Sequence, residues 1–361
     1  MGRTTDLDLS AMPADFAGWY GSHLDKLSSA RATVERIVRA RLAPVRARLV
    51  RSAQLGAEAR RVKDGYEVRL NAALPAIVHF AFNSLLRTPQ FMYGVGDAES
   101  EQPHRESSKR IPLALPRGMK VEEAIVAITS VSRPRDTQRA ATAVLMSELA
   151  VAYCAYHELA HVLLGHVDAH RQWTGRLGLL EMAESAMPEG RASARVRMVW
   201  EYEADLVATN MLLQDLVASD AEPVFREAYG GDNDCGVLAR FQAMLGAILV
   251  VFLLVAQATP IKRRTHPEPL IRFAAVANDS AAVLVEQQLQ LRLSFEEVSE
   301  AVNDLALSAL SAWSNLGLGT SPASPLKNLL KAQWVVERLE QDRQELHALY
   351  SGGAAFYPFK R

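Results

Sequence analysis

The sequence predicts a mainly α-helical fold with a small β-sheet (α+β), and three observations support this fold class. Long segments repeat apolar residues at helical spacing, the longest over about residues 136–170. One short segment, 63–71, alternates apolar and polar residues as a strand does. Of the 361 residues, 49% are hydrophobic and 22% are charged, which is the composition of an ordinary folded protein. The formal net charge of −1 argues against nucleic acid as a partner.

Residues 1–62 are predicted to form an N-terminal helical cap. Apolar residues recur at helical spacing from Val34 to Leu49, arginines occupy the other faces, and Pro44 is expected to kink or split this helix. The arginines allow contact with an anionic surface, membrane or RNA, but a solvated face over a packed stripe explains them better. The first residues lack a basic stretch followed by an apolar one, so no secretory signal is expected.

The next part of the chain is predicted to contain a strand, a helix and a loop. Residues 63–71 open with an Asp-Gly turn and then alternate, which predicts the strand. Pro75 suits the first turn of a helix over about 74–87. The stretch 94–119 is polar and rich in Pro and Gly, so we expect a long exposed loop, either a flap over a cleft or a disordered segment.

The segment 136–170 is predicted to be the central helix, because it is apolar on nearly all sides and therefore buried. It contains the HExxH pattern. On a helix, residues four apart share a face, so His157 and His161 can bind one metal ion together. Glu158 lies beside the ion, where it can accept a proton from a water whose pKa zinc lowers to about 7. An ordinary buried helix is the poorer explanation, since burying these groups without partners is costly.

A third ligand is expected further along the chain, because catalytic zinc usually has three protein ligands. His166 is rejected, since nine positions after the first histidine on a continuous helix it faces away from the ion. A second helix, over about 192–216, carries Glu201 and Asp205 four apart on one face. We assign Glu201 to the metal and Asp205 to the free N–H of a ligating histidine. Glu203 points elsewhere and is the alternative ligand.

Three motifs follow one another in the chain: HELAH at 157–161, EYEAD at 201–205, and Thr265-His266-Pro267 followed by Arg272. In this order they resemble the gluzincin zinc metallopeptidases. They are similar to the HtpX-type peptidases and to the Lit-like peptidases of bacterial phage exclusion. The Lit-like peptidases carry HExxH followed by Gly-His and act in the cytoplasm on a host protein. The resemblance covers about residues 140–275.

The resemblance implies a zincin-like catalytic core over residues 63–280, with a C-terminal helical region, 281–361, packed on it. The pair of membrane-spanning segments expected between HExxH and the glutamate of HtpX-type enzymes is missing from this sequence, as is a tetratricopeptide tail. Amphipathic helices are predicted over 283–317 and 325–350. Their expected core residues are Leu305, Leu307, Leu310 and Trp313.

The resemblance also implies roles for residues outside the metal site. The strand 66–71 would hold the substrate backbone in extended form, as an edge strand does by strand addition. His266 would donate a hydrogen bond to the oxyanion of the tetrahedral intermediate, or it has a structural role at a helix start. Tyr202 is the rival donor, but its offset from Glu201 points it elsewhere. Arg272 would have a substrate-binding or a structural role.

Residues 241–261 carry no charge and meet the length rule for a membrane span, and three basic residues follow them as a cytoplasmic flank would. A span here would put Glu201 and His266 on opposite sides of the bilayer, although the resemblance places both in one site. Gln242 and Gln257 are compatible with burial inside a protein. We therefore predict a buried helix, and membrane contact through 241–261 is the alternative.

The two cysteines, Cys154 and Cys235, are too few for a disulfide framework, which suits a reducing cytoplasm. Cys154 lies three residues before His157, but a small buried hydrophobe explains it better than a ligand or a catalytic thiol. The predicted location is the cytoplasm, and the inner membrane is the alternative.

Together these patterns predict a zinc-dependent endopeptidase that hydrolyses a protein or peptide substrate with one Zn²⁺. His157, His161 and Glu201 would hold the metal, and Glu158 would be the general base. One alternative is a metal-binding regulatory protein with a zincin fold, which Glu158 argues against because a purely structural site has no use for a base. The other is a membrane-embedded HtpX-like peptidase.

Overall fold

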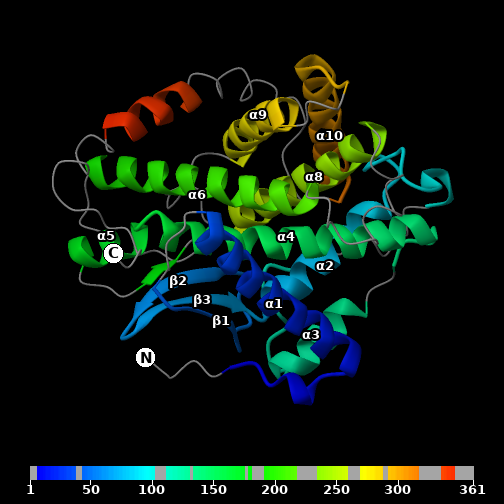
Figure 1. The fold of residues 1–361 in the computed structure, drawn as a ribbon. Helices are drawn as coiled ribbons and strands as arrows, with labels where there is room; N and C mark the ends of the chain where they lie inside the picture. The colour runs from blue at the N-terminus through cyan, green and yellow to red at the C-terminus, as the bar shows by residue number, and fades with distance from the viewer. Residues whose placement is uncertain are drawn as a thin grey trace.

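The computed structural model describes residues 6–37, 43–101, 111–130, 133–174, 178–180, 191–217, 234–258, 269–287, 292–316 and 335–345. The fold is mainly helical with a small sheet, which confirms the predicted class (Figure 1). The elements are η1 (Leu9–Ala11), α1 (Ala14–Ile37), β1 (Val45–Val50), β2 (Ala57–Val62), β3 (Gly65–Asn71), α2 (Ala73–Leu86), η2 (Ala98–Ser100), α3 (Val121–Thr129), α4 (Thr137–Leu163), α5 (His166–Thr174), β4 (Gly178–Leu180), α6 (Arg191–Val217), α8 (Asp234–Ala258), α9 (Pro269–Gln287) and α10 (Phe295–Asn315).

The long helix α4 is the centre of the fold. Asp136 caps its N-terminus by accepting a hydrogen bond from the backbone N–H of Arg139, 2.9 Å away. Figure 1 shows α6 lying along one side of α4, the sheet on the opposite side, and α1 crossing in front. The helices α2 and α8 also pack against α4. Because it is enclosed in this way, nearly every residue in its second half is buried, including the whole HExxH pattern.

The sheet has the strand order β1-β3-β2-β4. Strand β3 runs parallel to β1 and antiparallel to β2, and β4 pairs antiparallel with β2. The prediction of a strand at 63–71 is confirmed, but the prediction that it is an edge strand is wrong. Its Val68 lies opposite both Ala47 and Ala59, so backbone groups on both sides of β3 are paired within the sheet. Among the described strands, β1 and β4 lie at the edges.

The helix predicted across Val34 to Leu49 is wrong in its second half. Helix α1 ends at Ile37, and Val45–Val50 is strand β1. The apolar residues Val45 and Leu49 are four apart, which suits a helix, but with Ala47 between them they also alternate as a strand does. Pairing with β3 selects the second pattern. Part of the predicted N-terminal cap therefore belongs to the sheet, and the division into three domains stays a prediction.

The central helix predicted over 136–170 is interrupted near its end. Helix α4 ends at Leu163, Gly165 has a φ of 74°, and α5 starts at His166. The left-handed region is accessible to glycine at low cost because glycine has no Cβ, and it is a common conformation of the residue just past a helix. The N–H groups of Leu164 and Gly165 donate to the carbonyls of Ala160 and Val162, closing the last turn.

Helix α8 contains the apolar run. Of the described helices, it is the one long and apolar enough to cross a membrane: the most apolar 18 residues within Gly236–Ala258 have a mean hydropathy of 2.3. The most apolar part of this helix is 78% buried inside the fold, where it packs on α4, α9 and α10. Gln242 donates a hydrogen bond from its side chain to the carbonyl of Ala301 (3.0 Å). The described part of the predicted segment, residues 241–258, is therefore largely buried as predicted, and membrane contact through 241–261 stays the alternative.

The C-terminal helices differ from the prediction in two respects. Residues 283–287 belong to α9, and α10 begins at Phe295, where Ser294 and Glu297 form a capping box. Leu305, Leu310 and Trp313 are buried as predicted, but Leu307 is 43% exposed. It lies two residues after Leu305, which turns its side chain about 200° around the helix. Within the predicted helix 325–350, residues 335–345 are described and are helical.

The predicted loop 94–119 is partly described. Residues 94–101 and 111–119 contain turns and the short helix η2. Ile111 and Leu115 are buried, whereas residues 116–119 are exposed, so the described part matches the predicted exposed loop only in part. Residues 102–110 lie outside the described part of the chain.

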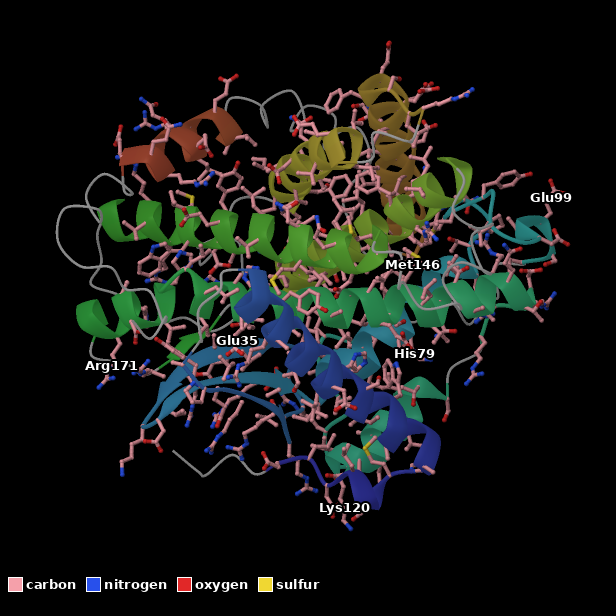
Figure 2. The ribbon with its side chains drawn as sticks, in the orientation of Figure 1. Glu35, His79, Glu99, Lys120, Met146 and Arg171 are labelled. Atoms are coloured by element: carbon pink, nitrogen blue, oxygen red, sulfur yellow. The ribbon has the colours of Figure 1, made fainter. Side chains whose placement is uncertain are left out.

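His79 of α2 is buried and is labelled in Figure 2. We expect this histidine to lower the free energy of unfolding at acid pH. Burial, together with the charge of Arg133, lowers its pKa from 6.5 to about 4. As the pH falls, His79 takes up a proton in the unfolded chain at a higher pH than in the folded protein. Its contribution to the free energy of unfolding is therefore full above about pH 6.5 and falls as the pH drops towards 4. The expected contribution is up to about 3 kcal/mol.

The measurement is urea unfolding of wild type and His79→Gln at pH 7.5 and pH 4.5. The variant should lose less stability between the two pH values than the wild type loses. Equal losses would show that His79 does not titrate in this way.

Candidate metal centre

Three buried side chains from two helices converge in the centre of the fold. His157 and His161 come from α4 and Glu201 from α6, and one ligand atom of each lies within 4.8 Å of the others. The Nε2 atom of His157 is 3.1 Å from Nε2 of His161 and 3.2 Å from Oε2 of Glu201. The Nε2 atom of His161 is 3.7 Å from Oε1 of Glu201. This group could hold a metal ion, and two imidazoles with one carboxylate are a set that catalytic zinc uses.

The convergence follows from two helical spacings and one helix–helix contact. His157 and His161 are four apart on α4, and their rings meet edge to face with centroids 4.7 Å apart. Helix α6 packs along α4, as Figure 1 shows, and brings Glu201 to the same point. Burial lowers the pKa of His161 well below 6.5, so the ring is neutral and its nitrogen lone pair is available to a metal.

Asp205 lies one helical turn after Glu201 and contacts the other nitrogen of the first histidine. Its Oδ1 is 3.0 Å from Nδ1 of His157. Burial by itself would raise the pKa of Asp205, but the Arg272 guanidinium and the hydrogen bonds from His157 and Arg272 outweigh it and lower the pKa to about 2. The ionised carboxylate accepts the Nδ1 hydrogen, which leaves Nε2 of His157 with its lone pair on the side of Glu201.

Arg272 of α9 holds this carboxylate in place. Its Nε and Nη2 atoms donate to the two oxygens of Asp205, each at 2.7 Å, and the Tyr153 hydroxyl donates to Oδ1 at 2.6 Å. The guanidinium also lies over the ring of Phe252, 4.4 Å from its centroid, and Nη2 is 3.9 Å from Oε2 of Glu201. Of the two roles predicted for Arg272, this geometry supports the structural one.

His166 lies next to His161, although it was predicted to face away. The two Nδ1 atoms are 2.9 Å apart. The prediction assumed one continuous helix, and the turn at Gly165 instead brings the ring back towards the site. The ring is buried, and burial lowers its pKa. His166 is not part of the three-residue group, so it lies beside this group and not in it. The Leu-Gly that precedes it in the sequence was the available signal for a helix end.

Glu203 and Tyr202 lie away from the three converging side chains. Oε2 of Glu203 is 3.2 Å from Nε2 of His166, and its Oε1 is 3.3 Å from Nε of Arg343. Tyr202 packs in a small apolar cluster with Val199, Ala275 and Leu339. Of the two glutamates considered as third ligand, Glu201 is the one in the group.

Three further residues were singled out in the sequence: Glu158, Cys154 and His266. Glu158 follows His157 on α4 and is fully buried. Cys154 is buried and lines a small apolar cavity beside Leu74, Val78 and Val251, as expected of a small hydrophobic residue. His266 lies in the stretch 259–268, outside the described residues, so its predicted role stays a prediction.

One family of known proteins matches the part of the chain that contains these residues. The family described as Peptidase U49 matches residues 105–288, which is 184 of the 361 residues and includes all of α4, α6 and α9. No curated protein and no solved structure matches the chain. The match covers more than half of the chain and contains His157, His161 and Glu201, so this protein belongs to the Peptidase U49 family and is a peptidase.

Proposed function

We propose that this peptidase is a zinc-dependent endopeptidase of the gluzincin type. His157, His161 and Glu201 would hold one Zn²⁺, and Glu158 would be the general base. The observation that carries the proposal is the buried group of two histidines and one glutamate, whose ligand atoms lie within 4.8 Å of one another. Its substrate would be a protein or peptide, as for any peptidase.

The donor set supports zinc in particular. Zinc takes histidine nitrogen and carboxylate oxygen in catalytic sites and leaves a further position open. Each of the two histidines has a partner at its Nδ1 atom, Asp205 for His157 and His166 for His161. Such partners set the tautomer in which Nε2 is free to bind a metal. Burying two imidazoles and a carboxylate is costly without a cation, which is a second reason to expect one here.

The chemistry divides between the metal and the chain. When bound, zinc would make water acidic and polarise the scissile carbonyl. Glu158 would accept the proton of the attacking water and then pass it to the leaving amine, as a general base that becomes a general acid. Asp205, held by Arg272, would keep the ring of His157 in its orientation throughout.

The biological setting is proposed from the resemblance to Lit-like peptidases. Membership of the Peptidase U49 family supports it. We propose that the enzyme acts in the cytoplasm on one host protein during phage exclusion. A comparison in cells between wild type and a variant without the general base tests this part.

Replacing Glu201 tests the metal site directly. Purified wild type should bind one zinc ion per chain. In Glu201→Ala the zinc affinity should fall by more than about 100-fold, because loss of a residue that only hydrogen-bonds to a ligand can already cost about 100-fold. The measurement is competition with a chromophoric chelator. Asp304→Ala, which removes an exposed carboxylate of α10, should leave the affinity unchanged. Zinc binding by Glu201→Ala with wild-type affinity would exclude Glu201 as a ligand.

A further inference from the structure

The second histidine of the metal centre has a histidine as its own partner. Nδ1 of His161 and Nδ1 of His166 are 2.9 Å apart, and both residues are buried, with exposures of 0% and 4%. On its other side, Nε2 of His161 faces His157 and Glu201. His161 therefore lies between the metal ligands and His166, and each of its two nitrogens has a distinct neighbour.

Metal binding at Nε2 of His161 determines where the hydrogens along this contact lie. A ligating Nε2 uses its lone pair, so Nδ1 of His161 carries the hydrogen and donates it. Nδ1 of His166 must then accept, because two hydrogens do not fit between nitrogens 2.9 Å apart. The remaining nitrogen of His166, Nε2, carries the other hydrogen and points it at Oε2 of Glu203, 3.2 Å away.

The far end of this chain is also held. Oε1 of Glu203 is 3.3 Å from Nε of Arg343, which belongs to the helical segment 335–345. The ring of Trp200 stacks on the ring of His166, with centroids 5.2 Å apart and planes 16° from parallel. Stacking sets the plane of the His166 ring, and Glu203 sets its rotation within that plane.

Helix α6 thus supports both histidine ligands from two of its faces. Glu201 and Asp205, four apart, face His157, while Trp200 and Glu203, three apart, face His166. The first ligand has a carboxylate as its direct partner. The second has a carboxylate that acts through an intervening imidazole.

We propose that His166 is a positioning residue for His161, and that Glu203 orients His161 through it. The proposal rests on the metal site of the proposed function and adds to it the partner of the second histidine ligand. Partners of ligating histidines fix the ring and raise its basicity, and losing one typically lowers metal affinity about 10- to 100-fold.

The test is zinc affinity of the full-length chain, measured by competition with a chromophoric chelator. His166→Phe keeps a ring to stack on Trp200 but removes the acceptor, so the affinity should fall about 10- to 100-fold. His166→Asn offers a side-chain oxygen to Nδ1–H of His161 and should recover part of the loss. The matched control is His170→Phe, one turn further along α5 and equally buried, which should bind zinc like the wild type.

Two further measurements separate the outcomes. In the cobalt-substituted protein, the visible absorption bands report ligand geometry, and they should change in His166→Phe and not in His170→Phe. If His166→Phe does not fold, Glu203→Leu removes the acceptor at the far end and should lower zinc affinity in the same direction. If His166→Phe and Glu203→Leu bind zinc as tightly as a tightly binding wild type, the positioning role is overturned and the proposed function stands. A wild type that binds no zinc would overturn both.

Discussion

Glu158→Gln is expected to abolish peptide hydrolysis while zinc stays bound. Glutamine has nearly the shape of glutamate but cannot accept a proton, and general acid–base catalysis typically contributes about 10²- to 10⁴-fold to the rate. The three proposed ligands, His157, His161 and Glu201, are unchanged, so zinc content should equal that of the wild type. The measurement compares newly formed protein termini in cells that produce wild type or variant, with the zinc content of both purified proteins determined in parallel.

A second glutamate on the same helix is the control for Glu158. Glu148→Gln makes the same chemical change in α4, about nine residues before His157, and should retain activity. The same variants test phage exclusion by plaque counts: cells with wild type or Glu148→Gln should yield fewer plaques than cells with Glu158→Gln. If wild type and Glu158→Gln gave the same cleavage products at equal zinc content, the proposed role of Glu158 as general base would be wrong. Equal plaque counts would remove the proposed role in phage exclusion.

Arg272→Met is expected to destabilise the fold by about 3–5 kcal/mol, because it leaves a buried carboxylate without its cation. Asp205 is 1% exposed, and Arg272 donates two hydrogen bonds to it. Methionine can still pack on the ring of Phe252, so the loss comes from the ion pair and less from volume. The measurement is urea unfolding at pH 7, with stability taken from the midpoint and slope.

The paired variant identifies the cause of this loss. Adding Asp205→Asn to Arg272→Met removes the unpaired charge, so the double variant should be more stable than the sum of the single losses predicts, by about 0.5–3 kcal/mol. Arg338→Met, which removes a half-exposed arginine, should change stability by less than about 0.5 kcal/mol. Wild-type stability of Arg272→Met would mean that Asp205 does not depend on this arginine.

The low pKa of Asp205 also makes the effect of Arg272→Met on stability depend on pH. In the wild type the carboxylate contributes stability above its unfolded pKa of 3.8, and this is lost as the pH falls to about 2. Without Arg272 the folded pKa rises, so Arg272→Met should lose less stability than wild type over that range.

The three residues of the proposed metal site could be predicted because each depends on a spacing within one helix. His157 and His161 are four apart in a strongly apolar segment, and Glu201 and Asp205 are four apart in another. A helix brings such pairs to one face wherever it lies in the fold. Once a shared metal is assumed, the two faces must meet, and the packing of α4 on α6 makes them meet.

His166 and β1 could not be predicted in the same way, because their positions depend on a local pattern with two solutions. The chain after Leu163 could continue as helix or turn at Gly165, and the turn reverses the direction of the His166 ring. Val45, Ala47 and Leu49 suit a helix edge as well as a strand, and β3 decides between the two by pairing. The interior place of β3 then follows from β1 and β2 on its two sides.

The amino-acid sequence by itself determined the helical class of this protein and the two pairs of site residues, since helical periodicity is a property of neighbouring positions. Tertiary structure decided which groups support those residues. The contact of Arg272 with Asp205 joins residues 67 positions apart, and that of His166 with Glu203 joins residues 37 positions apart. Contacts of this kind depend on how whole helices pack, which no spacing along the chain specifies.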